Sequence, residues 1–190
     1  MIGIRKITPD NFDARARVVY DFASYWHRNQ KRKYSKEPYV NHLAAVANTI
    51  WTFTRSSPLV AVALCHDLFE DTDCEEEVLR KALREAGYTS EEVGYIIRLV
   101  WHLTDQFTKE DFPELNRKER MALEVERLST IHPDAQTVKY ADILDNQPDI
   151  AKNDPHFSIV FTREAKAKMK VMDKGLPELR ELVNEVINRC

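Results

Sequence analysis

Residues 61 to 73 constrain the fold of this 190-residue chain more than any other stretch. The stretch begins as a nearly unbroken apolar run and ends in a cluster of ionisable side chains. In a helix, residues four apart share a face, so His66 would face the same way as Glu70. Asp67 and Asp71 would form a second such pair. Burying these groups beside an apolar segment is costly unless a partner is present.

Imidazole and carboxylate groups together suit a divalent cation such as Mn²⁺, Fe²⁺, Zn²⁺ or Mg²⁺. The alternative interpretation is a solvated acidic helix end in which His66 and Asp67 are adjacent by chance. Cys65 beside His66 is expected to be a structural thiol, because neighbours on a helix point about 100° apart.

The composition predicts a helical protein. Only four glycines occur, which favours long helices with few tight turns. The pattern contains no convincing pair of strands and no internal repeat. We therefore expect an all-α fold of about eight to ten helices, forming one domain over residues 1–190.

Apolar periodicity and capping residues place the individual helices. The first should start near 9–11 and end in a basic linker at 27–36. The second should open at 38–41 with His42 in its first turn, and the third, after Ser56, should carry His66 and Asp67. Further helices are expected over Glu75 to Ala86, Thr89 to Leu103, from Asn116, from His132 to Asn146, around Phe161 to Met172 after breaks at Pro148 and Pro155, and from Pro177, with a loop from Gln106 to Pro113.

Charge and cysteine usage set the compartment and the partners. The net charge of −3 implies no general attraction to nucleic acid or to an anionic membrane. Three cysteines without CxxC spacing indicate reduced thiols. No apolar run is long enough to span a membrane. We expect a cytoplasmic protein that binds a small molecule, with a homo-oligomer left open.

Four groups of residues remain as candidates for chemistry: His42, the pair His66 and Asp67, the pair Glu70 and Asp71, and Asp142 with Asn146. Asp142 lies on an otherwise apolar stretch, where carboxylates rarely sit without a partner. The chain has no phosphate-binding glycine loop, no HExxH helix and no GxSxG turn.

The order His, His-Asp, Asp on helices resembles that of the HD phosphohydrolase superfamily. Three segments narrow the resemblance: Glu37 to His42 (EPYVNH), His66 to Asp73 (HDLFEDTD) and Val138 to Asn146 (VKYADILDN). They are similar to the hydrolase domain of RelA/SpoT proteins, and in size to the stand-alone small alarmone hydrolases of the metazoan SpoT homologue type. The resemblance covers residues from about Gln30 to Met172.

The resemblance implies an all-helical, Mn²⁺-dependent enzyme that removes the 3′-pyrophosphate of guanosine tetra- or pentaphosphate, leaving GDP or GTP. By position it implies metal ligands at His42, His66, Asp67 and Asp142, a water-activating pair at Glu70 and Asp71, and a substrate contact at Asn146.

Basic residues are candidates for substrate contacts. Lys31 and Arg32 precede the EPYVNH segment, where the family places a basic pair near the purine base. Lys139 and the cluster Arg117, Lys118 and Arg120 are candidates for the phosphates, and a solvated surface is an equal alternative for them.

The chain departs from the family pattern at positions that recognise substrate. Gln147 and Pro148 follow Asn146 where the family usually has Leu or Met and then Arg, and the loop near Gln106 to Pro113 is enlarged. Reaction class is therefore better defined than substrate. The alternatives are a hydrolase that prefers the adenosine alarmone, another HD nucleotidase acting on dNTPs or monophosphates, and a nucleotide sensor without turnover. No synthetase domain is expected after Cys190.

Overall fold

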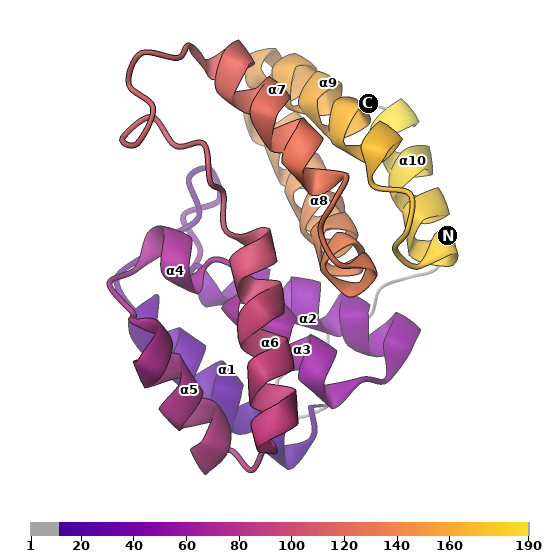
Figure 1. Cartoon of the computed structure of the whole chain (residues 1–190). Helices are drawn as coiled ribbons and strands as arrows, with labels where there is room; N and C mark the ends of the chain where they lie inside the picture. Colours follow the sequence, from indigo (N-terminus) through magenta and orange to yellow (C-terminus); the bar gives the residue numbers. More distant parts are fainter. Residues whose placement is uncertain (1–11, 190) are drawn as a thin grey trace. The chain divides into compact units, whose positions relative to one another are not determined.

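The computed structural model describes residues 12–189, and these residues are helical with no strand (Figure 1). A single isolated antiparallel bridge pairs Lys31 with Pro38 in this part of the chain. The predicted all-α fold is confirmed. The chain forms two compact units, one ending at Leu103 and the other beginning at Thr104. A single domain over 1–190 stays a prediction.

The first unit is built around α3, which is apolar on every side and fully surrounded. All of its residues but Pro58 are buried, and it packs against α1, α2 and α6. A helix that is apolar all round belongs in a core, because no face of it can be solvated cheaply. The helices of this unit are α1 (Ala14–Trp26), α2 (Val40–Thr54), α3 (Ser57–Cys65), α4 (Leu68–Asp71), α5 (Glu76–Glu85) and α6 (Ser90–Leu103).

Local sequence signals set where α2 and α3 begin. Ser56 caps α3, its side chain accepting a hydrogen bond from the Leu59 amide, and Pro58 lies in the first turn. His42 lies in the first turn of α2, as predicted. The expected start of the first helix, near 9–11, falls outside the described residues, and within them Asp13 caps α1.

The expectation that the third helix carries His66 and Asp67 is wrong. α3 ends at Cys65, and Asp67 has φ −98° and ψ 2°, which interrupts the helix before α4. The break turns the chain so that α4 packs against α6. The Asp71 amide still donates to the Asp67 carbonyl at 2.9 Å. Asp67 and Asp71 therefore remain one turn apart.

The second unit consists of four helices. α8 is the longest and packs against α9 and α10, while α7 packs against α9. Much of α8 is buried, including Tyr140, whose hydroxyl donates to the Met172 carbonyl at 2.6 Å. The helices are α7 (Arg117–Leu128), α8 (Pro133–Asn153), α9 (Pro155–Val171) and α10 (Pro177–Arg189), and 106–113 is a loop, as predicted.

The predicted break at Pro148 is also wrong, because α8 continues through it to Asn153. Tertiary contacts account for the difference. Gln147 is fully buried and its amide donates to the Thr162 hydroxyl on α9 at 2.9 Å. Ile150 is buried one turn further on. Packing on both sides of the proline holds the helix together despite the lost backbone hydrogen bond.

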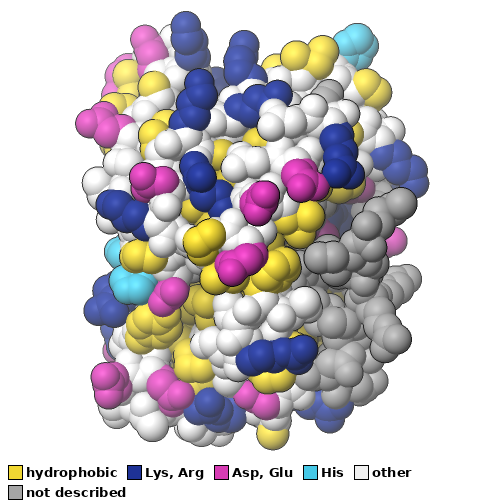
Figure 2. Space-filling view, turned by 90° about the vertical axis from the view of Figure 1, so that its right-hand side faces the viewer, with side chains coloured by type: hydrophobic (Ala, Val, Ile, Leu, Met, Phe, Trp, Pro, Cys, Tyr) yellow, Lys and Arg dark blue, Asp and Glu magenta, His cyan; other side chains and the backbone are white. Residues whose placement is uncertain are grey.

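The basic first turn of α7 has an anionic partner. Arg117 forms two parallel hydrogen bonds with the Glu164 carboxylate, at 2.8 and 2.9 Å. Asn116 and Glu119 form a capping box at the same helix end. On the face shown in Figure 2, side chains of both charge signs occur, in keeping with a net charge of −3. Within the described part, no helix is both long and apolar enough to cross a membrane.

Candidate metal centre

Three predicted ligands meet in the first unit. His42 comes from the first turn of α2, and His66 and Asp67 lie in the break between α3 and α4. His42 Nε2 is 3.6 Å and His66 Nε2 is 3.1 Å from the same oxygen, Oδ2 of Asp67. One ligand atom from each residue lies within 4.8 Å of the others. Both imidazoles are buried.

The hydrogen bonding of His66 fixes which of its nitrogens can bind a cation. His66 Nδ1 lies 2.8 Å from the Ala63 carbonyl oxygen. A carbonyl only accepts, so Nδ1 carries the proton and, in the neutral ring, Nε2 carries the lone pair. That lone pair faces the Asp67 carboxylate. A cation held by both groups satisfies this arrangement.

The spacing of the donor atoms fits a divalent ion. Two ligands about 2.1 Å from an ion are about 3.0 Å apart at a right angle and about 3.4 Å apart at a tetrahedral angle. The observed 3.1 and 3.6 Å lie close to these values. Imidazole and carboxylate donors without thiolates suit the harder first-row metals. The residues present therefore fit a divalent metal.

Tyr39 supports the carboxylate of this group. Its hydroxyl donates to Oδ2 of Asp67 at 2.7 Å. The tyrosine ring lies edge-on to His42, with ring centroids 5.5 Å apart, and stacks on His27 at 5.2 Å. Tyr39 thus touches two of the three candidate ligands and limits their movement.

Glu70 and Asp71, the predicted water-activating pair, lie on α4 directly after the candidate ligands. Both side chains are exposed. The Gln30 amide donates to Oδ2 of Asp71 at 2.8 Å, across 41 residues of sequence. The carboxylate of Asp71 therefore has a defined orientation in the first unit.

The basic linker is a tight loop attached beside these residues. The Arg32 amide donates to the Glu37 carbonyl at 2.9 Å, and the Tyr39 amide donates to the Gln30 carbonyl at 3.1 Å. Lys36 adopts a left-handed backbone, with φ 61°, which closes the loop. Because Gln30 and Tyr39 contact Asp71 and Asp67, both ends of the loop that carries Lys31 and Arg32 lie at the candidate site.

The remaining predicted residues lie on α8 in the second unit. Asp142 is buried and lies between two donors. Lys139 Nζ is 3.1 Å from its Oδ2, and the Asn146 amide donates to its Oδ1 at 2.6 Å. Burial and the nearby Lys139 lower the pKa of Lys168 on α9, while Asp142 opposes that shift. The four-residue spacing predicts that Asp142 and Asn146 share a helix face, and they do. The structure adds Lys139 to this pair.

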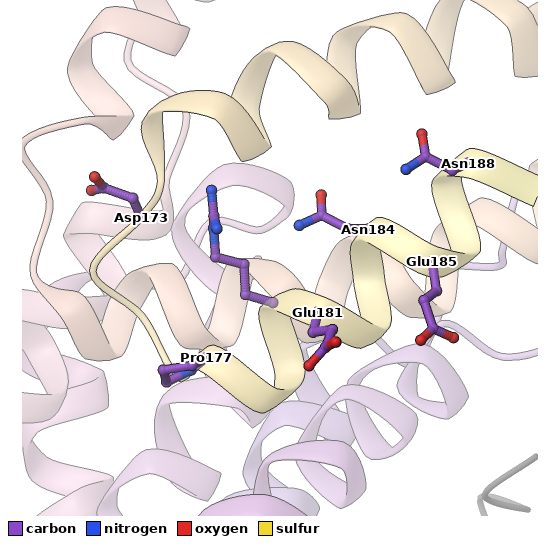
Figure 3. A pocket seen from close by; sticks show the side chains of 7 residues that line it. Asp173, Pro177, Glu181, Asn184, Glu185 and Asn188 are labelled. Atoms are coloured by element: carbon purple, nitrogen blue, oxygen red, sulfur yellow. The ribbon is translucent and has the colours of Figure 1, made fainter.

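The Cys65 thiol and a surface pocket along α10 are not part of the candidate site. Burial, with Cys74 nearby, raises the pKa of the Cys65 thiol, so it stays protonated and unreactive as expected. Figure 3 shows a polar pocket along α10 that contains none of the predicted site residues. Arg180 in its lining donates to the Met169 and Met172 carbonyls, which secures the end of α9.

Sequence reasoning missed three residues of the candidate site: His27, Gln30 and the hydroxyl of Tyr39. His27 and Gln30 are three residues apart in the first part of the basic linker, directly after the end of α1 at Trp26. That spacing at a helix end, together with the position of Tyr39 in the EPYVNH segment, was the only available signal. Their contacts join segments 28 and 41 residues apart and follow from the tertiary fold.

Comparison with known proteins shows that this chain contains an HD domain. Residues 19–89 match a family model described as HD domain, which includes His42, His66 and Asp67. A solved structure described as a metazoan ortholog of SpoT that hydrolyses ppGpp and has a role in starvation responses is also similar. It has a TM-score of 0.74 and 26% identity, with 93% of this chain and 96% of that chain covered.

Two curated relatives make the assignment more specific. The guanosine-3′,5′-bis(diphosphate) 3′-pyrophosphohydrolase MESH1 of Drosophila melanogaster is 31% identical over 137 residues, which are 70% of this chain and 68% of the relative. MESH1 of Homo sapiens is 35% identical over 138 residues, 71% of this chain and 69% of the relative. The chain belongs to the MESH1 family of HD-domain proteins.

Proposed function

We propose that this protein hydrolyses guanosine 3′,5′-bis(diphosphate), ppGpp, to GDP and pyrophosphate. The observation that carries the proposal is the group of His42, His66 and Asp67, whose donor atoms fit a divalent metal in a member of the MESH1 family. The pentaphosphate form would give GTP in the same way. We further propose Mn²⁺ as the metal, with Asp142 as a fourth ligand, and a cytoplasmic location.

A divalent ion bound here lowers the pKa of water and offsets negative charge on the phosphate that reacts. The protein residues have separate roles. Glu70 and Asp71 accept the proton of the attacking water. Tyr39 holds the Asp67 carboxylate through its hydroxyl. Attack on phosphorus then breaks the bond to the 3′-oxygen, which takes a proton and leaves with GDP.

The remaining predicted residues are assigned to the substrate. The guanidinium of Arg32 can stack on the guanine, and Lys31 can contact a phosphate, because both ends of their loop lie at the candidate site. Lys139 and Asn146 are proposed as further substrate contacts on α8. The contacts proposed for Lys31, Lys139 and Asn146 are charge-assisted or polar, as recognition of a highly anionic nucleotide requires.

Product analysis tests the proposal. The Mn²⁺-loaded protein is incubated in H₂¹⁸O with ppGpp, with ppApp, and with a panel of dNTPs and nucleoside monophosphates. We expect ppGpp to give GDP, with ¹⁸O only in the pyrophosphate. A chelated sample and a His66→Ala variant serve as controls. Turnover of dNTPs with ppGpp left intact would overturn the proposed substrate, and ¹⁸O in GDP would overturn attack on phosphorus.

A further inference from the structure

A chain of hydrogen bonds reaches Asp71 from the buried end of α1. His27 is buried, with 2% of its surface exposed. Its Nδ1 lies 2.5 Å from Oε1 of Gln30, and Nε2 of Gln30 donates to Oδ2 of Asp71 at 2.8 Å. All three residues belong to the first unit.

The direction of these bonds follows from the chemistry of the last group. A carboxylate only accepts, so the Gln30 amide nitrogen must face Asp71 and its carbonyl oxygen must face His27. That oxygen also only accepts. His27 Nδ1 must therefore carry the proton, and every donor in the chain points toward Asp71.

Further contacts fix His27 and Gln30 in these hydrogen bonds. The His27 ring stacks on Tyr39, with centroids 5.2 Å apart and an interplanar angle of 24°. The backbone N–H of Gln30 donates to the backbone carbonyl of His27 at 2.9 Å. The backbone carbonyl of Gln30 accepts from the backbone N–H of Tyr39 at 3.1 Å. His27 Nε2 is buried, and no described residue offers it a hydrogen bond. The fold keeps the Nδ1 contact although the described part of the chain supplies no partner for Nε2.

We propose that His27 and Gln30 are positioning residues that hold the Asp71 carboxylate in the orientation in which it accepts a proton from water. This inference rests on the role given to Asp71 in the proposed function. The Gln30 contact uses one carboxylate oxygen, and the second oxygen can accept the proton. An exposed carboxylate rotates unless a contact fixes it, and a general base works only within hydrogen-bond reach of its proton.

Kinetics of Gln30→Ala give the first test. We expect kcat for ppGpp to fall about tenfold and KM to stay within about twofold, because the contact acts on the proton acceptor and not on the substrate. Asn29→Ala, a change at the exposed neighbouring residue, should leave both constants unchanged. An unaltered kcat in Gln30→Ala would overturn the proposal.

Two conservative variants separate the donor from the bulk of the side chain. Gln30→Glu keeps the size and the acceptor for His27 but places a second carboxylate against Asp71, so kcat should fall at least as far as in Gln30→Ala. His27→Phe keeps an aromatic ring against Tyr39 and removes the Nδ1 donor to Gln30, so kcat should fall about threefold. Wild-type kcat in Gln30→Glu would contradict the proposal.

A double-mutant cycle tests whether Gln30 acts through Asp71. In an Asp71→Ala background, measured at high protein concentration, Gln30→Ala should change kcat by less than about twofold. A tenfold effect that persists without Asp71 would assign Gln30 a purely structural role.

Nuclear magnetic resonance gives a readout that does not depend on turnover. Two-bond ¹H–¹⁵N spectra of His27 should show the Nδ1–H tautomer, and its ¹⁵N shifts should change in Gln30→Ala and in Asp71→Ala but not in Asn29→Ala. An Nε2–H tautomer would overturn the contact chain. A wild-type protein that shows the expected tautomer but leaves ppGpp intact would refute the proposed function and the role in proton transfer, while the contact itself would stand.

Discussion

Asp67 is the carboxylate at which two imidazoles and a tyrosine hydroxyl meet. His42, His66 and Tyr39 all lie within 3.6 Å of its Oδ2. The Tyr39 hydroxyl donates to Oδ2 of Asp67 and stabilises its negative charge. His66 Nε2 instead presents a lone pair to the same oxygen and does not stabilise that charge. A divalent ion removes that conflict, which is why the residue-level chemistry favours a metal over an empty polar cluster.

The sequence predicted the candidate ligands better than the residues that hold them. His42, His66 and Asp67 lie in short segments with a specific order, and the structure brings all three together. The supporting contacts of Tyr39 and Gln30 cross 28 and 41 residues and follow no periodicity. Pairing of side chains at such separations depends on how helices pack, so no local pattern could have indicated it.

At the same scale, chemistry and metal binding can be separated. Glu70→Gln combined with Asp71→Asn should lower kcat by about 10²–10⁴-fold, the usual contribution of general-base catalysis. Metal and substrate affinity should stay near wild type, because both side chains keep their size and neither belongs to the candidate ligands. Single-turnover rates and calorimetric titration with Mn²⁺ measure the two quantities. Loss of the metal instead would mean that these carboxylates are ligands or structural supports.

At the scale of helices, capping signals were reliable and helix continuity was not. Ser56, Asn116 and His132 cap helices where the sequence placed them. The break after Cys65 and the continuity through Pro148 were missed for opposite reasons. Asp67 leaves the helix at the point where its side chain accepts a hydrogen bond from Tyr39. The helix α8 continues through its proline because Gln147 and Ile150 are buried on either side of it.

Pro148 therefore reduces the stability of α8, and its replacement should stabilise the second unit. Pro148→Ala should raise the free energy of unfolding by about 1–2 kcal/mol. Proline costs about 3 kcal/mol within a helix, and its stiffening of the unfolded chain offsets roughly 1 kcal/mol of that cost. Pro148 is exposed, so the change leaves no cavity. Urea denaturation followed by circular dichroism measures the difference.

Pro155→Ala is the matched control for this prediction. Pro155 occupies the first position of α9, where its missing amide hydrogen costs nothing. The control should therefore bring no gain in stability. Equal stabilisation by both replacements would indicate an effect on the unfolded chain. It would argue against removal of the proline's helix-breaking cost within α8.

At the scale of the whole molecule, the predicted ligands are divided between two compact units. Three belong to the first unit, which ends at Leu103, and Asp142 belongs to the second. The assignment of Asp142 as a ligand comes from the sequence. In its own unit Asp142 is buried between Lys139 and Asn146, so its charge is compensated without a metal. Asp142→Ala should leave a folded helical protein, because alanine favours a helix and the other buried residues of α8 are unchanged.

The same variant should lose the metal. Removing a hydrogen-bond partner of a metal ligand costs about 10–100-fold in affinity, so removing a ligand should cost at least about 100-fold. Wild type should gain about 2.7 kcal/mol of stability at Mn²⁺ concentrations 100 times its Kd, and Asp142→Ala should gain almost none at the same concentration. Thermal melts with and without Mn²⁺ measure this, and ppGpp turnover should disappear in parallel. Asp149→Ala is the control and should behave as wild type, because the Asp149 carboxylate accepts a hydrogen bond from Asn153 on the same helix and is not among the predicted ligands. Full metal-dependent stabilisation in Asp142→Ala would restrict the metal site to the first unit.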